Sequence, residues 1–549
     1  MDHNSFDTDN ELITKQSDWV RLFDLPGVVE QITDSPCGGE GTCGKCRVLV
    51  LAGECQPPTA EENIWLNAVE LEQGIRLACF CRIKGNIKLR FPKKAVPQIL
   101  LNTPGKNCNT KDNRIFNRIN APRQYGIAID LGTTTIVSSL FDLATGKELH
   151  VSATLNPQSS YGLDVMSRIN YSSRDGGTEK LQCLLIDRLV EMICECCANA
   201  GMVASDIQEI AVAGNTIMLH ILAGVDPSAM GRFPYTPVFT SAIRVPAAQL
   251  GMHSLTAAEV YIMPSVSAFI GADTVAGILA TGLEQETGNT LLLDLGTNGE
   301  LVLCSNHQLW ACSVAMGPAL EGMNIECGMR AENGAVDKVW IEDNKLCLHV
   351  IGEGEAIGLC GTGLLDTVGA LVKAGIVAKN GRLLMENKPD RFADWSDSIT
   401  ESKQGRRFWL RHPLERENGL YISQNDIRNL QLAKGAVCAG IKLLLDAAGI
   451  KTDQVQKINL SGALGNYINP DVLIELGFFP PEWRDKVIPL GNSALKGAIM
   501  ALMSPANRAR ALHISQQIKC LDLTSSQEFQ YLFPRSMSLS ADSWSSAQK

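Results

Sequence analysis

Several features are missing from this sequence of 549 residues. No apolar run approaches the roughly 20 residues that a helix needs to span a bilayer. The polar, acidic start, MDHNSFDTDNELITK, lacks the apolar stretch of a secretory signal. With 49 Lys and Arg against 59 Asp and Glu, the chain also lacks the positive charge that attracts nucleic acids and anionic membranes. We therefore expect a cytoplasmic protein that binds neither nucleic acid nor membrane.

Cysteine, in contrast, is abundant, with 18 residues. In a reducing compartment these side chains are thiols or metal ligands rather than disulfides. The segment PCGGEGTCGKCR, residues 36–47, spaces three cysteines as C-x5-C-x2-C, and a fourth follows in GIRLACFC. A glycine-rich loop with three thiolates, joined by one distant thiolate, is the ligand pattern of a [2Fe–2S] ferredoxin. The predicted metal ligands are Cys37, Cys43, Cys46 and Cys79.

Two alternatives to this prediction stay open. A structural zinc site also uses C-x2-C pairs, although it does not need four glycines in the loop. Cys81 is the rival of Cys79 as the fourth ligand. The flanking segments RCRVLVLAGE and IKLRFP read as strands, and Thr59 with Glu62 forms a capping box ahead of a helix that ends near Gly74. Because little chain precedes the loop, we expect an abbreviated ferredoxin-like domain over residues 17–94.

The rest of the chain contains an internal repeat. Residues 95–124, rich in Pro, Asn, Thr and Lys, are predicted to form a linker. YGIAIDLGTTTIVSSLFDL then begins at Tyr125, and LLLDLGTNGELVLC begins at Leu291. Each is an apolar strand that ends in Asp-Leu-Gly-Thr, followed by a turn and another strand. The repeat predicts two related lobes that face a cleft, residues 125–290 and 291–505. The Ser-rich residues 506–549 are expected to be a partly disordered tail.

The two turns have the chemistry of a nucleotide site. Backbone amides and threonine hydroxyls in such turns hold phosphate oxygens, and glycine permits their close approach. Asp130 and Asp294 end the two strands and are expected near a nucleotide-bound Mg²⁺, which keeps much of its water shell. The predicted phosphate-binding residues are Gly132, Thr133, Thr134, Gly296, Thr297 and Asn298.

This pair of turns resembles the superfamily of acetate and sugar kinases, Hsp70 and actin. KINLSGALGNYINP and LGNSALKGAIMAL agree with it, and the resemblance implies that the adenosine is held by Ser461, Gly462, Gly465 and Gly491. It also implies that Asp273, in FIGADTVAGIL, is the catalytic base, although a helix N-cap is the alternative role. The expected fold is α/β: an N-terminal β-grasp [2Fe–2S] ferredoxin-like domain followed by a two-lobed, ribonuclease H-like ATPase.

A narrower resemblance rests on the order of eight segments: PCGGEGTCGKC, RLAC, IDLGTTT, NPQSSYGLDVMSRI, VAGNTIMLHILAGVDP, GADT, DLGTNGE and MGPALEG. In this order the chain closely resembles the reductive activators of corrinoid proteins, ATPases that return Co(II) cobalamin to Co(I). The resemblance implies an enzyme that uses ATP and Mg²⁺ to pass one electron from a [2Fe–2S] cluster to the corrinoid protein of a methyltransferase system. An external low-potential donor would reduce the cluster.

The chain departs from that family in two respects. It lacks the separate domain that many members carry between linker and ATPase, and no C-x2-C-x2-C run follows residue 46. No Asp-x-His-x-x-Gly segment surrounds any histidine, so the corrinoid is expected on the partner. Two other functions stay open: activation of another low-potential enzyme, such as a 2-hydroxyacyl-CoA dehydratase, and a non-catalytic redox or nucleotide sensor. The sequence leaves a homodimer open.

Overall fold

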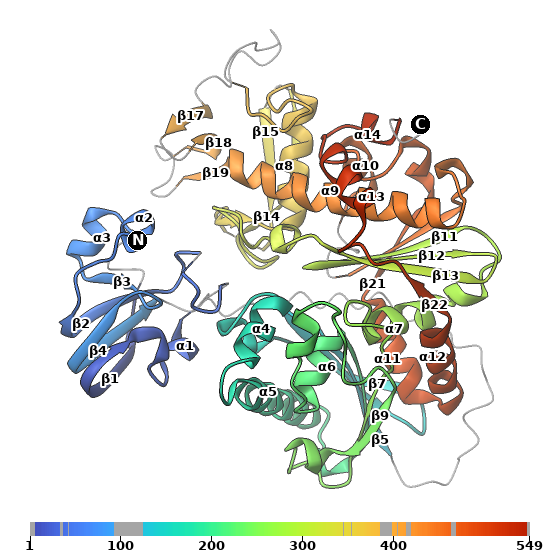
Figure 1. Ribbon diagram of the computed structural model, residues 1–549, viewed down its shortest axis with the longest axis horizontal. Helices are drawn as coiled ribbons and strands as arrows, with labels where there is room; N and C mark the ends of the chain where they lie inside the picture. Colours follow the sequence, from blue (N-terminus) through green and yellow to red (C-terminus); the bar gives the residue numbers. More distant parts are fainter. Residues whose placement is uncertain are drawn as a thin grey trace.

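The computed structural model describes residues 6–32, 37–41, 43–92, 124–343, 345–352, 354–384, 398–402, 405–412, 419–462 and 468–545. It has an N-terminal domain beside a body of two lobes (Figure 1). The predicted linker, residues 95–124, lies outside the described residues except for Gln124. No helix in the described part of the chain has the length and apolarity that crossing a membrane requires.

The N-terminal domain is built on an antiparallel sheet of four strands in the order β1-β4-β2-β3. Its first strand begins at Phe6, so the domain starts before the predicted boundary at residue 17. Short helical segments connect the strands and cover the core. The elements are β1 (Phe6–Arg21), η2 (Leu22–Asp24), α1 (Val28–Gln31), β2 (Arg47–Cys55), α2 (Glu62–Trp65), α3 (Ala68–Glu72), β3 (Ile75–Leu77) and β4 (Arg82–Pro92).

The two lobes repeat one topology, as the sequence repeat predicts. In lobe I, β5, β6 and β7 form an antiparallel meander and β8 pairs in parallel with β5. In lobe II, β11, β12 and β13 form the same meander and β20 pairs in parallel with β11. The central strands are buried on both faces, which explains their continuous apolar runs. The sheet orders are β7-β6-β5-β8-β10-β9 and β21-β20-β11-β12-β13-β22.

The strands of lobe I are β5 (Tyr125–Leu131), β6 (Thr135–Asp142), β7 (Lys147–Leu155), β8 (Ile207–Gly214), β9 (Ile243–Pro246) and β10 (Glu259–Ile262). Those of lobe II are β11 (Thr290–Leu295), β12 (Asn298–Ser305), β13 (Gln308–Ala315), β20 (Lys457–Ser461), β21 (Val487–Gly491) and β22 (Ile518–Cys520). Lobe II also carries two smaller sheets, formed by β14 (Ala335–Glu342), β15 (Lys345–Val350) and β16 (Gly358–Leu359), and by β17 (Ile399–Ser402), β18 (Gly405–Arg411) and β19 (Leu420–Ser423).

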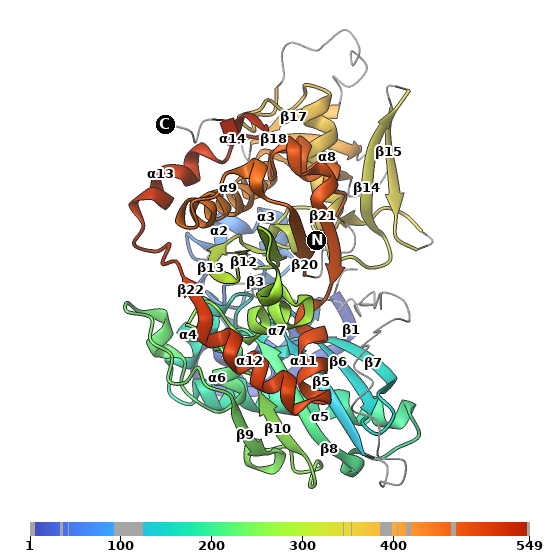
Figure 2. The same cartoon turned by 90° about the vertical axis from the view of Figure 1, so that its right-hand side faces the viewer.

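Helices cover both sheets. Lobe I has α4 (Val165–Ser172), α5 (Gly177–Asn199), α6 (Thr216–Leu222) and α7 (Ala272–Thr281). Lobe II has α8 (Gly361–Lys373), α9 (Gln424–Ala447) and α10 (Pro470–Glu475). The chain then returns to lobe I, because α11 (Ser493–Met503) and α12 (Pro505–Gln517) pack beside α7 (Figures 1 and 2). The predicted boundary of lobe II at residue 505 is therefore wrong, since both lobes contain residues from the C-terminal part of the chain.

The prediction of a partly disordered tail over residues 506–549 is also wrong for its described part. After α12, strand β22 pairs in parallel with β13, and α13 (Gln527–Arg535) packs on α9. The buried Lys434 ammonium donates hydrogen bonds to the carbonyls of Ser536 and Ser538 at 2.7 and 2.6 Å. The indole of Trp544, in α14 (Asp542–Ser545), donates to Gly477. Tertiary contacts thus order a segment whose composition alone indicates disorder.

Candidate functional site

The four predicted cysteine ligands lie close together in two pairs. The sulfur atoms of Cys37 and Cys43 are 3.3 Å apart, and those of Cys46 and Cys79 are 3.2 Å apart. Two sulfurs on one tetrahedral metal with bonds of about 2.3 Å lie about 3.8 Å apart. Each pair therefore has nearly the separation that one metal ion demands.

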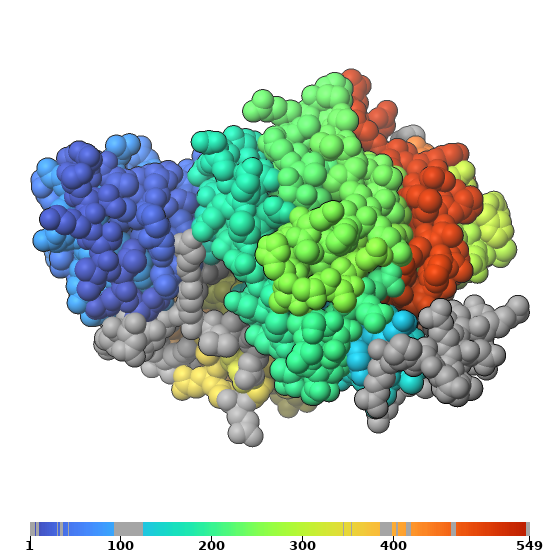
Figure 3. Space-filling view, turned by 90° about the horizontal axis from the view of Figure 1, so that it is seen from below, coloured from blue at the N-terminus to red at the C-terminus, as the bar shows by residue number. Residues whose placement is uncertain are grey.

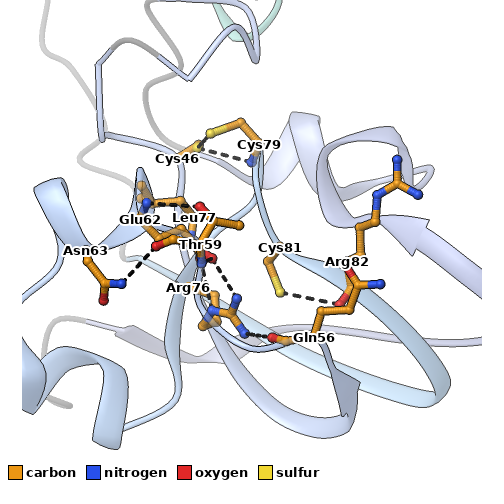
Figure 4. Close-up of polar contacts among 10 residues, drawn as sticks. All are labelled: Cys46, Gln56, Thr59, Glu62, Asn63, Arg76, Leu77, Cys79, Cys81 and Arg82. Carbon is orange, nitrogen blue, oxygen red and sulfur yellow. Dashed lines mark hydrogen bonds and ion pairs between the residues drawn. The ribbon is translucent and has the colours of Figure 1, made fainter.

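This pairing fits a cluster of two irons with two thiolates each. A mononuclear zinc site needs all its ligands to converge on a single point, whereas the distances here join the sulfurs two by two. Cys81 turns away from the Cys46–Cys79 pair, and its thiol points to the carbonyl of Arg82 at 3.8 Å (Figure 4). The geometry thus favours Cys79 over Cys81.

A buried ion pair positions Cys79. The guanidinium of Arg76 in β3 donates to both carboxylate oxygens of Glu62, at 2.9 and 2.6 Å (Figure 4). Glu62 also accepts from the amide of Leu77, and its predicted capping box with Thr59 is present. Because β3 ends two residues before Cys79, this pair fixes where the fourth thiol lies. The predicted helix over this region is instead two short helices, α2 and α3.

The loop glycines allow the chain to wrap closely. Gly41 and Gly44 have φ values of +80° and +64°, which favour glycine. A β-carbon on Gly41 would lie 2.3 Å from the ring of Phe80, and one on Gly44 would lie 2.6 Å from the ring of Trp65. Hydrogen bonding to Cys46, together with burial, raises the pKa of the Cys79 thiol. Holding four thiolates here requires compensating cations, as two irons would supply.

The two predicted phosphate turns meet where the two lobes face each other. The hydroxyl oxygens of Thr134 and Thr297 are 3.5 Å apart, although 163 positions separate them in the sequence. Gly132 permits the tight turn, because a β-carbon there would lie 2.4 Å from the carbonyl oxygen of Thr135. Thr133 completes the first turn, and Gly296 and Asn298 flank Thr297 in the second. The structure therefore brings the predicted turn residues together.

Partly buried carboxylates lie beside these turns. Burial raises the pKa of Asp130 and of Asp294 to about 7, and that of Asp273 to about 6. Asn492 donates to Asp130 at 2.6 Å and Ser461 donates to Asp294 at 3.3 Å. Closely spaced buried acids favour a bound cation, since like charges and desolvation both oppose ionisation without one.

Asp273 is not the N-cap of its helix. Helix α7 begins at Ala272 with Gly271 as its N-cap, and the amide of Thr274 donates to Oδ1 of Asp273 at 2.7 Å. The sequence missed Glu300, whose pKa burial raises well above its usual value, with Asp273 and Asp294 adding to the rise. Glu300 ends the quoted segment DLGTNGE, but it received no role because it lies on β12 like an ordinary strand residue.

The predicted adenosine residues lie beside Asp294. Ser461 donates to the carbonyl of Gly491 at 3.0 Å and lies 2.6 Å from the hydroxyl of Ser493. Gly462 has a φ of +100°, and a β-carbon there would lie 2.7 Å from Oδ1 of Asp294. Gly465 lies outside the described residues.

Glu321 is a second residue that the sequence did not assign. Its carboxylate accepts hydrogen bonds from Thr134 at 2.9 Å and from Thr297 at 3.0 Å, so one side chain joins the two turns. Burial raises its pKa. It ends η8 (Pro318–Glu321), inside the segment MGPALEG, whose flanking glycines were the available signal.

Several residues of lobe I donate hydrogen bonds to Gly132 and Thr133 and thereby hold the first turn in place. Asn156 donates to the carbonyl of Gly132 at 3.0 Å, and Asn215 donates to the hydroxyl of Thr133 at 3.0 Å. Asn215 caps α6 as well, through the amide of Met218. Arg168 donates to the carbonyl of Thr133 at 2.5 Å. The polar segment NPQSSYGLDVMSRI thus packs against the phosphate site.

Comparison with known proteins gives consistent relatives. A family model described as "RACo middle region" matches residues 125–286, and one described as "C-terminal domain of RACo the ASKHA domain" matches residues 288–548. The chain is 34% identical over 385 residues to a corrinoid activation enzyme, RamQ, of Eubacterium limosum. That match covers 69% of this chain and 64% of the relative, so it spans less than two thirds of that protein.

Two further relatives are similar over most of their length. A [Co(II) methylated amine-specific corrinoid protein] reductase of Methanosarcina barkeri is 25% identical over 72% of this chain and 73% of its own length. A solved structure of a reductive activator for corrinoid, iron–sulfur protein is 28% identical and superposes with a TM-score of 0.69. It covers 93% of this chain, and the match includes 94% of that protein.

Proposed function

Because this chain belongs to the RACo family of reductive activators of corrinoid proteins, we propose that it uses ATP hydrolysis to reduce a corrinoid protein. The substrate cobalt goes from Co(II) to Co(I) by gaining one electron, and an external low-potential donor restores that electron to the chain. The corrinoid protein belongs to a methyltransferase system in the cytoplasm. The observation that carries the proposal is the pairing of four thiols in a domain tethered to a two-lobed ATP site.

Cys37, Cys43, Cys46 and Cys79 hold a [2Fe–2S] cluster in this proposal. When bound, such a cluster supplies single electrons at low potential. The two sulfur pairs support a diiron centre, and the Glu62–Arg76 ion pair keeps the fourth thiol in register with Cys46. Cys37 and Cys43 are partly exposed, whereas Cys46 and Cys79 are buried. The side of the site that carries Cys37 and Cys43 is therefore the more accessible one.

The residues between the two lobes have separate roles in ATP hydrolysis. The turn amides and the hydroxyls of Thr134 and Thr297 bind phosphate oxygens, and Asp130 with Asp294 would hold Mg²⁺. Asp273 accepts a proton from the attacking water, for which a raised pKa near 6 suits it. Closure of the cleft around ATP supplies the free energy that moves the electron uphill, at about 1.4 kcal/mol for each ~59 mV.

The test is ATP-dependent formation of Co(I), followed by absorbance, with reconstituted protein, a chemical reductant and a Co(II) corrinoid protein. Cys79→Ser should abolish both the diiron absorbance and Co(I) formation, while the matched variant Cys81→Ser keeps both. Asp294→Asn should keep the diiron absorbance and lose Co(I) formation. Co(I) formation by Cys79→Ser at the unaltered rate would overturn the electron path. Activation of a 2-hydroxyacyl-CoA dehydratase, with no Co(I), would overturn the choice of substrate.

A further inference from the structure

The cluster loop lies directly against lobe I of the ATPase. A β-carbon built on Gly38, next to Cys37, would lie 2.4 Å from the carbonyl oxygen of Tyr161. Two residues farther along the loop, the carboxylate of Glu40 pairs with Arg174 of lobe I at 3.1 Å. The space-filling view shows the N-terminal domain in contact with the part of lobe I that follows β7 (Figure 3). The contact therefore involves the loop that holds the cluster ligands.

A single buried arginine connects that contact to the phosphate site. Arg168, in α4, has no exposed surface, and its Nε donates to the carbonyl of Gly162 at 3.0 Å. Its Nη2 donates to the carbonyl of Thr133, in the first phosphate turn, at 2.5 Å. Gly162 follows Tyr161, whose carbonyl touches the cluster loop. One planar guanidinium thus bridges the backbone behind the cluster loop and the backbone of the phosphate turn.

The surroundings of Arg168 make this bridge stiff. Nη1 donates to Oε1 of Gln158 at 3.2 Å, and Gln158 donates in turn to the carbonyl of Leu181. Asp164 caps α4 through the amide of Ser167 at 2.7 Å. A β-carbon on Gly162 would lie 2.6 Å from the side chain of Ser167, so this peptide is packed tightly against the helix. Because this packing leaves no free space, we expect a shift of the phosphate turn to displace the 161–162 peptide as well.

The burial of Arg168 needs an explanation beyond stability. A buried guanidinium is costly unless its donors are satisfied, and here they are satisfied by two carbonyls, the amide oxygen of Gln158 and the thioether of Met218. Burial lowers its pKa to about 9, so the side chain remains charged at neutral pH. A charged, planar side chain that bonds the backbone of both elements is suited to linking their positions.

We propose that Arg168 is a positioning residue that couples nucleotide binding at the Thr133 turn to the cluster loop at Gly38. This inference rests on the proposed function and deepens it. ATP binding moves the turn, Arg168 carries the movement to the 161–162 peptide, and the loop responds by changing the environment of the cluster sulfurs. The nucleotide state thereby sets the ease with which the cluster gives up its electron.

The experiment measures the midpoint potential of the cluster in the full-length protein, with and without a non-hydrolysable ATP analogue. By linkage, the analogue binds the oxidised and reduced forms with different affinities, and we expect a ratio of about fivefold or more in the unaltered protein. That ratio corresponds to a shift of about 40 mV for one electron, at ~59 mV per tenfold. Arg168→Lys keeps the charge but cannot span both carbonyls, so its ratio should fall close to one.

Two matched controls keep the test decisive. Arg188→Lys alters an arginine of α5, in the same lobe, that pairs with Glu191 at 2.9 Å and should leave the ratio unchanged. If Arg168→Lys does not fold, Gly38→Ala carries the test, because its added β-carbon pushes the loop from Tyr161. Its control is Gly85→Ala, which has a similar positive φ of +91° but no neighbour within 4 Å.

The outcomes separate this inference from the proposed function. A full nucleotide-dependent shift in Arg168→Lys or in Gly38→Ala would overturn the coupling role. Absence of any shift in the unaltered protein, together with normal Co(I) formation, would also overturn it while leaving the proposed function intact. Failure to hold a cluster or to form Co(I) would instead contradict the proposed function itself.

Discussion

Replacing Asp294 with Asn should stabilise the nucleotide-free protein, and more so at high pH. Burial raises the pKa of Asp294 to about 7 from 3.8. The folded state therefore holds its proton between those values while the unfolded state has lost it. The contribution of Asp294 to the free energy of unfolding is therefore most favourable below pH ~4. It falls as the pH rises toward 7 and does not change further above that pH. Asn is neutral throughout and escapes this loss.

The magnitude follows from the same shift. Between pH 5 and the folded-state pKa near 7, the unaltered protein loses about 1.4 kcal/mol of unfolding free energy for each pH unit. The loss between pH 5 and pH 8 is therefore at most about 3 kcal/mol. Sharing of protons among the neighbouring acids lowers this, so we expect the advantage of Asp294→Asn to grow by roughly 1–3 kcal/mol. Functional carboxylates of this kind trade stability for activity.

The assay is urea unfolding at pH 5 and pH 8, without nucleotide or Mg²⁺. Asp187→Asn, an exposed aspartate of α5, is the matched control and should show the same difference from the unaltered protein at both pH values. If the advantage of Asp294→Asn is equal at the two pH values, or shrinks at pH 8, the carboxylate is not held in the desolvated state inferred from its burial.

Two further predictions concern single contacts. Glu62→Gln leaves Arg76 as an uncompensated buried charge, so urea unfolding should show the N-terminal domain destabilised by about 3–5 kcal/mol. The control Glu54→Gln breaks a largely exposed pair with Lys84 and should cost less than about 1 kcal/mol. Glu321→Gln removes a negative charge beside the threonine hydroxyls that we propose bind phosphate, so titration calorimetry should show ATP binding tightened by about 3- to 10-fold. Weaker binding would mean that Glu321 attracts the nucleotide through its metal ion instead.

The sequence predicted best what is local or repeated. The spacing of Cys37, Cys43 and Cys46 within one loop indicates a cluster without knowledge of the fold, and the structure brings them together. The repeated Asp-Leu-Gly-Thr motif predicted two equivalent turns, and their shared topology follows. The position of Cys79 was harder to predict from the sequence, because it depends on the Glu62–Arg76 pair that fixes β3.

What the sequence did not predict arises from contacts between distant segments. Glu321 lies 187 positions after Thr134, and Arg168 lies 35 positions after Thr133, so no sequence period reveals either contact, although the glycines of MGPALEG marked the segment of Glu321. The C-terminal segment was misread for the same reason. Its serines suggest disorder, yet Lys434 and the neighbouring Lys442 bind its carbonyls and fix it on α9.

The most direct test of the central claim is a single-turnover experiment. The cluster is reduced first, excess reductant is removed, and the Co(II) corrinoid protein is added with or without ATP while both chromophores are followed. We expect one cluster to be oxidised for each Co(I) formed, and only when ATP is present. Formation of Co(I) while the cluster stays reduced, or at the same rate without ATP, would contradict the claim that ATP hydrolysis drives electron transfer from the cluster of this chain to the cobalt.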